Sequence, residues 1–307
     1  MAALPPPPEG IVLAHFIVSD DVERSRRFYT EVLGGRLAYS GPGGLTYVAL
    51  SNSWIIINVG GGPTDDKPAV TLETPPDPDR VSSFLNIRVK DIATVYAEWS
   101  RRGANFLTEP KQHPYETRCY IRDPDGHLIE VGQTTDPEGD WTPPRWPTGT
   151  PGEGLVLTHF IVSQDVERSR RFYTEVLGGR VVFSGRPDGQ PTNVALSNSW
   201  IVISVGGGPT DDKPTVTLET PPDPDRVSSF VNVRVKDIAT VYAEWSARGA
   251  NFLTEPKQHQ YEIRCYIRDP DGHIIEVGQT TDLEGDWAPA RWPASTSAEE
   301  FGRAVAG

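Results

Sequence analysis

Two glutamates could do chemistry, because each lies inside an apolar stretch that is predicted as a β-strand. Glu130 follows the turn sequence Asp-Pro-Asp-Gly at 123–126, and Glu276 repeats the arrangement in the second half of the chain. Proline and glycine in the turn, with alternating residues on both sides, predict a β-hairpin. A carboxylate inside a strand needs compensation. An ion pair with Arg88 or Arg118 would suffice, because breaking such a buried pair costs about 3–5 kcal/mol.

The strands around Glu130 predict a sheet face of mixed character. Side chains alternate between the two faces of a strand, so the face of Glu130 should carry polar, cationic and aromatic groups. These residues and their copies are Phe84, Asn86, Arg88, Arg118 and Tyr120, and Phe230, Asn232, Arg234, Arg264 and Tyr266. Such a face is too polar for a core and too aromatic for an ordinary solvated surface. We therefore predict a cup that binds a ligand and treat these residues as candidate substrate contacts.

The first strand should add a histidine to this cup. We expect Phe16 and Val18 to pack toward the following helix, which leaves His15, Ile17 and Ser19 on the other face. His159 is the copy of His15.

Two other histidines, His113 and His127, are expected to have different roles. His113, with its copy His259, lies in a loop at the predicted rim and is a candidate general acid or base. His127 follows the turn glycine and is expected to be an exposed hairpin residue.

The elements that must position these residues follow the same pattern twice within each half of the chain. A strand at 12–18 precedes a helix at 22–33, for which Asp20 and Glu23 have the spacing of a capping box. Strands are predicted at 36–40, 46–50, 54–59, 83–89, 105–108, 117–122 and 127–132. Asp91 should cap a second helix with an apolar stripe of Ile92, Val95, Tyr96 and Trp99. Four βαβββ modules result, an α+β chain with mixed sheets and with helices on the outside.

The chain is an internal tandem duplication. Residues 51–142 and 197–288 differ at 11 of 92 positions. The prediction is a disordered Pro-rich N-terminus at 1–8, domains at 9–136 and 153–282, a linker at 137–152 rich in Pro, Gly and Trp, and a tail at 283–307. Two equivalent cups in a monomer, or a homodimer, would follow.

Composition excludes several classes of function. A net charge of −13 without a basic run argues against nucleic acid as a partner. No apolar run is long enough to span a membrane, and the N-terminus does not have the pattern of a signal peptide. Cys119 and Cys265 have no CxxC partner and are expected to be small packed hydrophobes in a reducing cytoplasm.

These motifs resemble the vicinal oxygen chelate superfamily. Its members include glyoxalases, extradiol dioxygenases, thiol transferases and bleomycin-binding proteins. The resemblance rests on the stretch from His15 to Ser25, on Phe28-Tyr29 with Leu33-Gly34, and on the Asp-Pro-Asp-Gly hairpin with Glu130. It covers both repeats and implies paired βαβββ modules around a cup. In metal-dependent members, first and last strands of the modules supply ligands to one divalent ion.

In each repeat the resemblance implies two metal ligands and two ligand positions that are not filled. Glu130 and Glu276 match the last-strand ligand, and His15 and His159 match the first-strand ligand. Residues at the other two positions do not fit: Phe84 stands where a histidine is expected, and Ile57 or Asn58 stands where a carboxylate is expected. Tyr120 and Tyr266 occupy a place where relatives contact substrate, so they could orient or protonate a ligand or simply form a wall.

Two functions remain open at this point. The first is a glyoxalase or dioxygenase type of enzyme, in which Fe, Mn, Ni or Zn at His15 and Glu130 would activate a small oxygen-rich or anionic substrate. The second is a metal-free protein that sequesters a small molecule, as the bleomycin-binding relatives do. A third hypothesis is a structural protein without enzymatic activity that serves as a platform for a protein partner.

Overall fold

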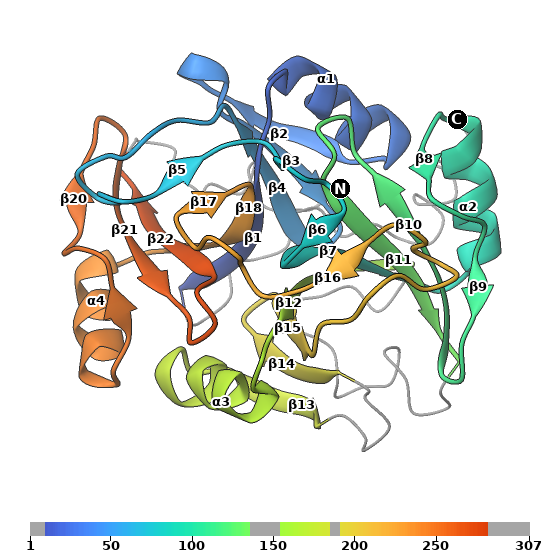
Figure 1. Cartoon of the computed structure of the whole chain (residues 1–307). Coiled ribbons are helices and arrows are strands. Elements are labelled where there is room, and N and C mark those ends of the chain that lie inside the picture. The colour runs from blue at the N-terminus through green and yellow to red at the C-terminus, as the bar shows by residue number, and fades with distance from the viewer. Residues whose placement is uncertain (1–9, 136–153, 185–190, 282–307) are drawn as a thin grey trace.

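The computed structural model describes residues 10–135, 154–184 and 191–281. The predicted N-terminal segment at 1–8, the linker at 137–152 and the tail at 283–307 lie outside these described residues. The four βαβββ modules and the α+β class are confirmed, with two mixed sheets of nine strands each. In Figure 1 the four α-helices lie at the periphery of the molecule and the strands lie between them.

Each sheet is built from both repeats. The first sheet joins strands of the first module of repeat 1 to strands of the second module of repeat 2. Its strands are β1 (Ile11–Val18), β2 (Arg36–Ser40), β3 (Thr46–Leu50), β4 (Ser53–Asn58), β18 (Ser229–Val235), β19 (Asn251–Phe252), β20 (Lys257–Gln258), β21 (Glu262–Arg268) and β22 (Ile274–Thr280). The two halves meet where β1 runs antiparallel to β18.

The second sheet has the same order with the repeats exchanged. Its strands are β7 (Ser83–Val89), β8 (Asn105–Phe106), β9 (Lys111–Gln112), β10 (Glu116–Arg122), β11 (Leu128–Thr134), β12 (Leu155–Val162), β13 (Arg180–Ser184), β14 (Thr192–Leu196) and β15 (Ser199–Ser204). Here β12 runs antiparallel to β7. The prediction that His15 of β1 and Glu130 of β11 share one cup is therefore wrong, because β1 and β11 belong to different sheets.

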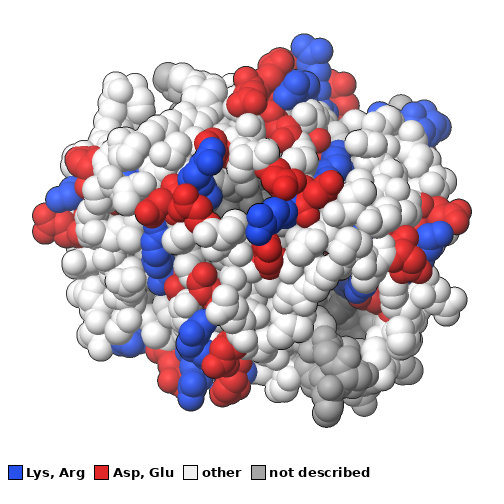
Figure 2. All heavy atoms as spheres, in the orientation of Figure 1, with Lys and Arg blue, Asp and Glu red and all other residues white. Residues whose placement is uncertain are grey.

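Short connecting strands also cross between the repeats. β5 (Thr71–Leu72) pairs with β17 (Arg226–Val227), and β6 (Arg80–Val81) pairs with β16 (Thr217–Leu218). In Figure 1, β6 and β16 lie near the middle of the view, and β5 and β17 lie to their left. The face they form carries cations and carboxylates side by side (Figure 2).

The helices begin at aspartate caps. They are α1 (Val22–Arg27), α2 (Ile92–Arg101), α3 (Val166–Arg171) and α4 (Ile238–Ala247), with π-helical turns at Phe28–Val32 and Phe172–Val176 and a 3₁₀ turn at Pro42–Gly44. The cap of α1 is Asp21, whose side chain accepts from the backbone N–H of Arg24, and not Asp20 as predicted. Asp91 caps α2 as predicted.

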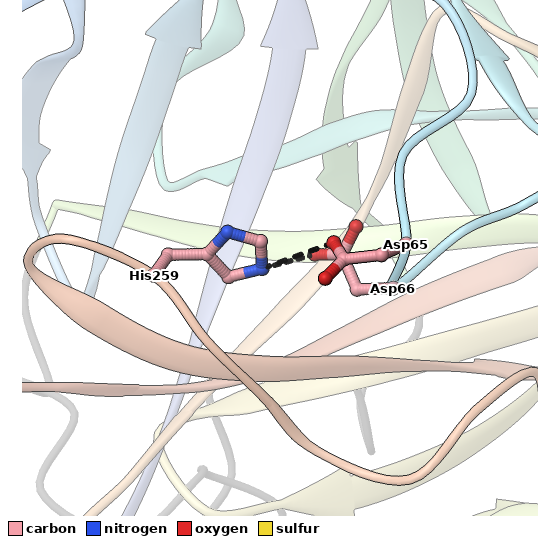
Figure 3. A group of neighbouring side chains, drawn as sticks. All are labelled: Asp65, Asp66 and His259. Atoms are coloured by element: carbon pink, nitrogen blue, oxygen red, sulfur yellow. Dashed lines mark ion pairs between the residues drawn. The ribbon is translucent and has the colours of Figure 1, made fainter.

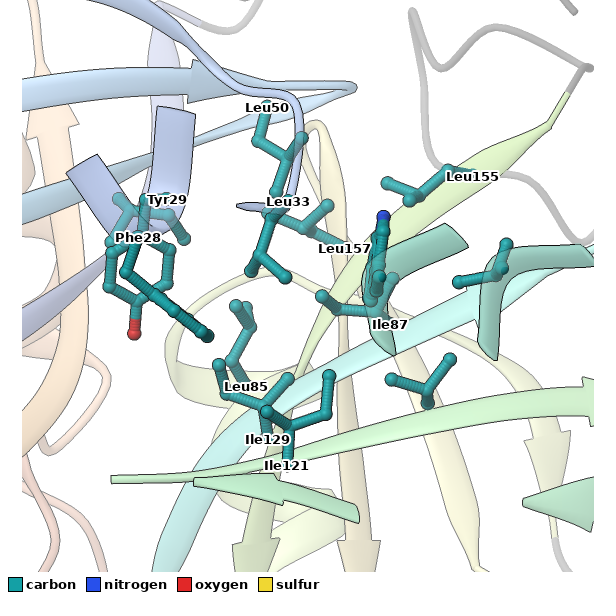
Figure 4. Close-up of a cluster of buried hydrophobic side chains, with 14 of the residues drawn as sticks. Phe28, Tyr29, Leu33, Leu50, Leu85, Ile87, Ile121, Ile129, Leu155 and Leu157 are labelled. Atoms are coloured by element: carbon teal, nitrogen blue, oxygen red, sulfur yellow. The ribbon is translucent and has the colours of Figure 1, made fainter. Parts of the chain in front are cut away.

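The core under the helices belongs mainly to one repeat at a time. In repeat 1, Phe28 and Tyr29 beside α1 share a buried cluster with Leu85, Ile87 and other residues on the helix side of the second sheet (Figure 4). Ile92, Val95 and Trp99 of the predicted stripe are buried in that cluster. Thus the helix side unites the two modules of a repeat, whereas the open side of each sheet unites different repeats.

The Asp-Pro-Asp-Gly hairpin turns stabilise the packing of the two modules within a repeat. Asp123 accepts a hydrogen bond from the Tyr29 hydroxyl at 2.9 Å, and Gly126 has a φ of 92° that favours glycine. His127 is buried and its Nε2 lies 2.7 Å from the Val18 carbonyl oxygen, so the prediction of an exposed residue is wrong. The turn docks on the first strand of its own repeat, which buries the histidine.

No helix within the described ranges is long and apolar enough to cross a membrane. Both cysteines are buried and free, as predicted for small packed hydrophobes.

Candidate functional site

The open side of the second sheet forms a cavity of about 600 Å³, which we call the second cup. One wall comes from β7, β10 and β11 of repeat 1, and the other comes from β12, β14, β15 and the glycine-rich loop of repeat 2. Its lining includes the predicted residues Asn86, Arg88, Arg118, Tyr120 and Glu130. Sequence periodicity therefore sorted the faces of the second-module strands correctly.

Glu130 lies on the floor of the second cup and is held by protein donors. Its Oε1 accepts from Asn86 Nδ2 at 2.6 Å, and its Oε2 accepts from the Tyr120 hydroxyl at 2.8 Å. Arg88 Nη1 lies 3.6 Å from the carboxylate. Burial and the neighbouring Glu116 raise the pKa of Glu130, against the opposing influence of Arg118 and Arg88. Of the two arginines offered by the sequence, Arg88 makes the ion pair.

Tyr120 is a donor in this network. Burial and the Glu130 carboxylate raise the pKa of the Tyr120 phenol well above its usual range. The proton therefore stays on the tyrosine, and the hydroxyl donates a hydrogen bond to Glu130. The chemistry that this geometry supports for Tyr120 is orientation of Glu130.

The other arginine of the cup is engaged at the rim. Arg118 Nη1 donates to Glu116 at 2.7 Å, and Arg118 Nε contacts Asp212, which reaches across from repeat 2. Although burial alone would raise the pKa of Asp212, hydrogen bonds from Thr210 and Arg118 lower it overall. Arg118 is thus a structural bridge between the repeats as well as a cup residue.

His15 and His159 are not part of the lining of the second cup. His15 pairs in register with Val231 and Ile55, which belong to the clusters under the helices, while its neighbour Phe16 stacks on Phe230 with ring centroids 4.4 Å apart. Directly paired residues share a face. The prediction that Phe16 and Val18 face the helix is therefore wrong: they face the cup, and His15 and Ile17 face the helix.

The proposed pairing of His15 with Glu130 fails for two reasons. The two residues belong to different sheets, and His15 faces away from the cup of its own sheet. The sheet of His15 carries Glu276, which pairs in register with Asn232 and Tyr266 on the opposite face. The histidines instead meet each other, with His15 Nδ1 3.2 Å from His159 Nδ1. The residues at these family positions do not fit a shared metal ion.

Glu276 repeats the environment of Glu130 in the first sheet. Its carboxylate accepts from Asn232 Nδ2 at 2.7 Å and from the Tyr266 hydroxyl at 2.8 Å, and Arg234 Nη1 lies 3.5 Å away. Arg264 contacts Asp66, as Arg118 contacts Asp212. The two carboxylate floors are therefore equivalent.

The two predicted aromatic contacts have a packing role. Phe84 stacks on Phe160 with ring centroids 4.3 Å apart, and Phe230 stacks on Phe16. All four rings are buried at the junction where the two repeats join within each sheet.

Histidines at the rims belong to groups that could hold a metal ion. Such groups are Asp65, Asp66 and His259, shown in Figure 3, and His113, Asp211 and Asp212. His259 Nε2 lies 3.0 Å from Asp66 Oδ2. The buried aspartate of each group also contacts an arginine, Arg264 or Arg118, which competes with a cation for the same oxygen.

Sequence reasoning missed the residues that the other repeat contributes to the second cup. They are Thr158, Phe160, Phe183, Asn193, Trp200, Ser204 and Lys213. The signal was present in the alternation of the first-module strands. It was assigned to the wrong face because a histidine was expected in the cup.

Comparison with known proteins identifies the family. The family model described as Glyoxalase/Bleomycin resistance protein/Dioxygenase superfamily matches residues 12–131 and again residues 156–277. A search of curated proteins found no match.

Solved structures share the fold. Glyoxalase I from Zea mays superposes with a TM-score of 0.54 at 16% sequence identity, and covers 96% of this chain and 96% of that chain. A point mutant of the same maize enzyme gives a TM-score of 0.55 at 16% identity, with 96% of each chain covered. A putative dioxygenase from Bacillus subtilis aligns with a TM-score of 0.49 at 14% identity, over 89% of this chain and 86% of that chain.

The two matched segments coincide with the two repeats, and the paired modules and mixed sheets agree with the family's fold. The chain belongs to the Glyoxalase/Bleomycin resistance protein/Dioxygenase superfamily and carries two copies of its domain.

Proposed function

We propose that this protein binds a small, uncharged, oxygen-rich molecule in the second cup, without a metal ion at Glu130. The observation that carries this proposal is that protein donors contact both oxygens of Glu130: Asn86 and Tyr120 each donate a hydrogen bond, and Arg88 lies 3.6 Å away. A metal ion would have to share these oxygens with the protein donors and lie beside the Arg88 cation. The function is that of a metal-free binding protein, the second of the two functions that the sequence left open.

The first-strand residue of the cup supports a site without metal. Thr158 pairs in register with Asn86, and its hydroxyl donates to Asn86 Oδ1 at 3.1 Å. Threonine is a poor ligand for the transition metals that imidazole binds. Its hydrogen bond instead fixes Asn86, which in turn holds Glu130.

Charge balance within the cup favours an uncharged ligand. Arg88 Nη1 donates to Glu116 at 2.8 Å and Arg118 is shared between Glu116 and Asp212. Lys213 Nζ contacts backbone carbonyl oxygens. Every cation of the lining therefore already has an anionic or carbonyl partner, and an anionic ligand would have to compete for it.

The remaining lining supports hydrogen bonding beside an aromatic surface. Phe160, Phe183 and Trp200 supply apolar walls. Asn193 Oδ1 is buried and has no hydrogen-bond partner among the described residues. A buried acceptor of this kind favours a ligand that brings a hydroxyl or N–H donor.

The equivalent position of the first sheet has a different surface. Tyr47 replaces Asn193, is buried, and packs against Trp54 with ring centroids 5.8 Å apart. Ala14 replaces Thr158, so Asn232 Oδ1 lacks the threonine donor. We propose that the polar ligand site belongs to the second cup and that Asn193 is its determinant.

An exchange of residues between the cups tests this function. Catechol and coumarin, two uncharged oxygenated ring compounds, are titrated against the intact chain with chelator present, and tryptophan fluorescence is recorded. We expect Asn193→Tyr to weaken binding of the preferred compound at least tenfold, and Tyr47→Asn to leave that site intact. Binding that needs a divalent metal, or that Asn193→Tyr leaves unchanged, would refute the proposal.

A metal-dependent enzyme of the same cup is the second candidate, and one observation favours it. His113, Asp211 and Asp212 lie together at the rim and could hold an ion. When bound there, a divalent ion would polarise an oxygen of the substrate. His113→Gln should abolish stoichiometric metal binding in this case and leave it unchanged if the site is adventitious.

A further inference from the structure

A second cavity lies between the repeats and shares only Phe160 with the lining of the second cup. It has a volume of about 280 Å³, and we call it the central cavity. Its outer part is formed by the proline-rich connectors at 75–78 and 221–224, which join β5 to β6 and β16 to β17. Its inner part includes His15, His159 and the serines that precede β7 and β18.

The histidine pair gives the central cavity a polar end. One proton serves the contact between the two Nδ1 atoms, so one ring is protonated at Nδ1 and the other at Nε2. One imidazole then has an Nε2 that accepts a hydrogen bond, and the other has an Nε2–H that donates. Reversing these roles moves two protons: the Nδ1 proton passes to the other Nδ1, and the Nε2 proton passes to the other Nε2 through a bound ligand or water.

One of these nitrogens lacks a hydrogen-bond partner within the described part of the chain. His159 is 1% exposed, and its Nε2 is buried without a hydrogen-bond partner among the described residues. Buried polar atoms are nearly always satisfied by protein, water or ligand. An orphaned imidazole nitrogen on a residue that lines a cavity is therefore a reason to expect a polar group of a bound molecule.

Other groups of the cavity indicate which molecule fits. Apolar contacts come from prolines, Phe160 and Phe230, and hydroxyl groups come from Ser82 and Ser228. The cations at the mouth are already paired across the repeats, Arg80 with Glu219 at 2.6 Å and Arg226 with Glu73 at 2.6 Å. The mixture of blue and red groups in the middle of Figure 2 includes no large area of one sign.

We propose that the central cavity is a second ligand site, which takes an uncharged ring compound whose hydroxyl or carbonyl group hydrogen-bonds to the His15–His159 pair. Because the pair can act as donor or acceptor, it suits either group. The site is built from both repeats and is separate from the second cup. Burial lowers the pKa of both histidines, which agrees with a neutral pair facing an uncharged ligand.

Fluorine NMR with 4-fluorophenol tests this site on the intact chain. The probe is uncharged at neutral pH and carries one hydroxyl group. We expect saturable binding, and at least fivefold weaker binding of 4-fluorotoluene, which lacks the hydroxyl. Equal affinity for both probes would overturn the role of the histidine pair, and absence of saturable binding would overturn the site.

Two sets of variants locate the probe. Ser82→Phe with Ser228→Phe fills the central cavity from partly exposed positions and leaves the backbone carbonyls that accept from Val162 and Val18 in place. This double variant should weaken the binding of 4-fluorophenol at least tenfold. Asn193→Tyr in the second cup should change the affinity for 4-fluorophenol less than twofold. The opposite pattern would assign the probe to the second cup and refute the central site.

A spectrum of the imidazole nitrogens keeps the test decisive if the filled variant does not fold. The chain has 6 histidines. Addition of 4-fluorophenol to the unmodified protein should shift the signals of His15 and His159 and leave those of His113 and His259 unchanged. Shifts confined to the rim histidines would contradict the proposal.

Discussion

Replacing His159 with asparagine should make the protein more resistant to acid. The imidazole is fully buried, and burial lowers its pKa from 6.5 to about 3. In the folded protein the ring stays neutral, whereas in the unfolded chain it takes up a proton below pH 6.5. A lowered pKa of this kind contributes stability above pH 6.5 that is lost as the pH falls toward 3.

The size of the effect follows from the pKa difference. A pH of 5 is about 1.5 units below the ordinary histidine pKa of the unfolded chain. The free energy of unfolding is therefore about 2 kcal/mol lower at pH 5 than at neutral pH. His15 shifts in the same direction, first by burial and then by the proximity of His159. Asparagine places an amide near the position of Nδ1 and does not titrate.

Urea denaturation at pH 7 and pH 5 measures this effect. The free energy of unfolding of the unmodified protein should fall by about 2 kcal/mol more between these pH values than that of His159→Asn. His113→Asn, at the rim of the second cup, is the matched control and should keep the full loss. An identical pH dependence in the unmodified protein and in His159→Asn would refute a buried neutral histidine pair.

Four further substitutions test the cup floors and the joint between repeats by urea denaturation at pH 7. Tyr120→Phe and Tyr266→Phe each remove a hydrogen bond to a buried carboxylate, and each should cost about 1.5–3 kcal/mol; unequal losses would contradict equivalent floors. Arg88→Met should cost about 3–5 kcal/mol because it leaves Glu130 unpaired, and a neutral result would disprove the ion pair. Asn52→Ala should cost about 1–3 kcal/mol, because Asn52 donates to the Leu157 carbonyl oxygen and accepts from its N–H across the repeats; no change would show that this joint is dispensable.

Much of the fold was predictable because local signals were consistent. The aspartate cap and stripe of α2, the alternation of β7 and the Asp-Pro-Asp-Gly turn each required only nearby residues. The same alternation predicted that Asn86, Arg88 and Tyr120 share a face with Glu130, and their contacts confirm it.

The joining of modules was not predictable from these signals. The repeats are so similar that β1 could pair with β7 or with β18 at almost equal cost, since only Leu85 and Ile87 of β7 are changed, to Val231 and Val233. Hence sequence reasoning had no basis for choosing between a cup within one repeat and a cup shared by two.

The position of His15 was mispredicted for a related reason. A histidine was expected to face the polar side of the sheet, and this expectation outweighed the apolar character of Ile17 on the same face. In the structure, contact with His159 from the other repeat compensates the buried ring. A contact between residues so far apart in the sequence cannot be inferred from the spacing of neighbouring residues.

The central claim is that Glu130 has a structural role on the floor of a cup that binds its ligand without metal. Titration of the intact chain with Mn²⁺, Ni²⁺ and Zn²⁺, compared with Glu130→Gln, tests it most directly. We predict that the substitution leaves metal binding unchanged, because Asn86 and Tyr120 hold both oxygens of the carboxylate and Arg88 supplies its counter-charge. Stoichiometric metal in the unmodified protein that disappears in Glu130→Gln would contradict the claim.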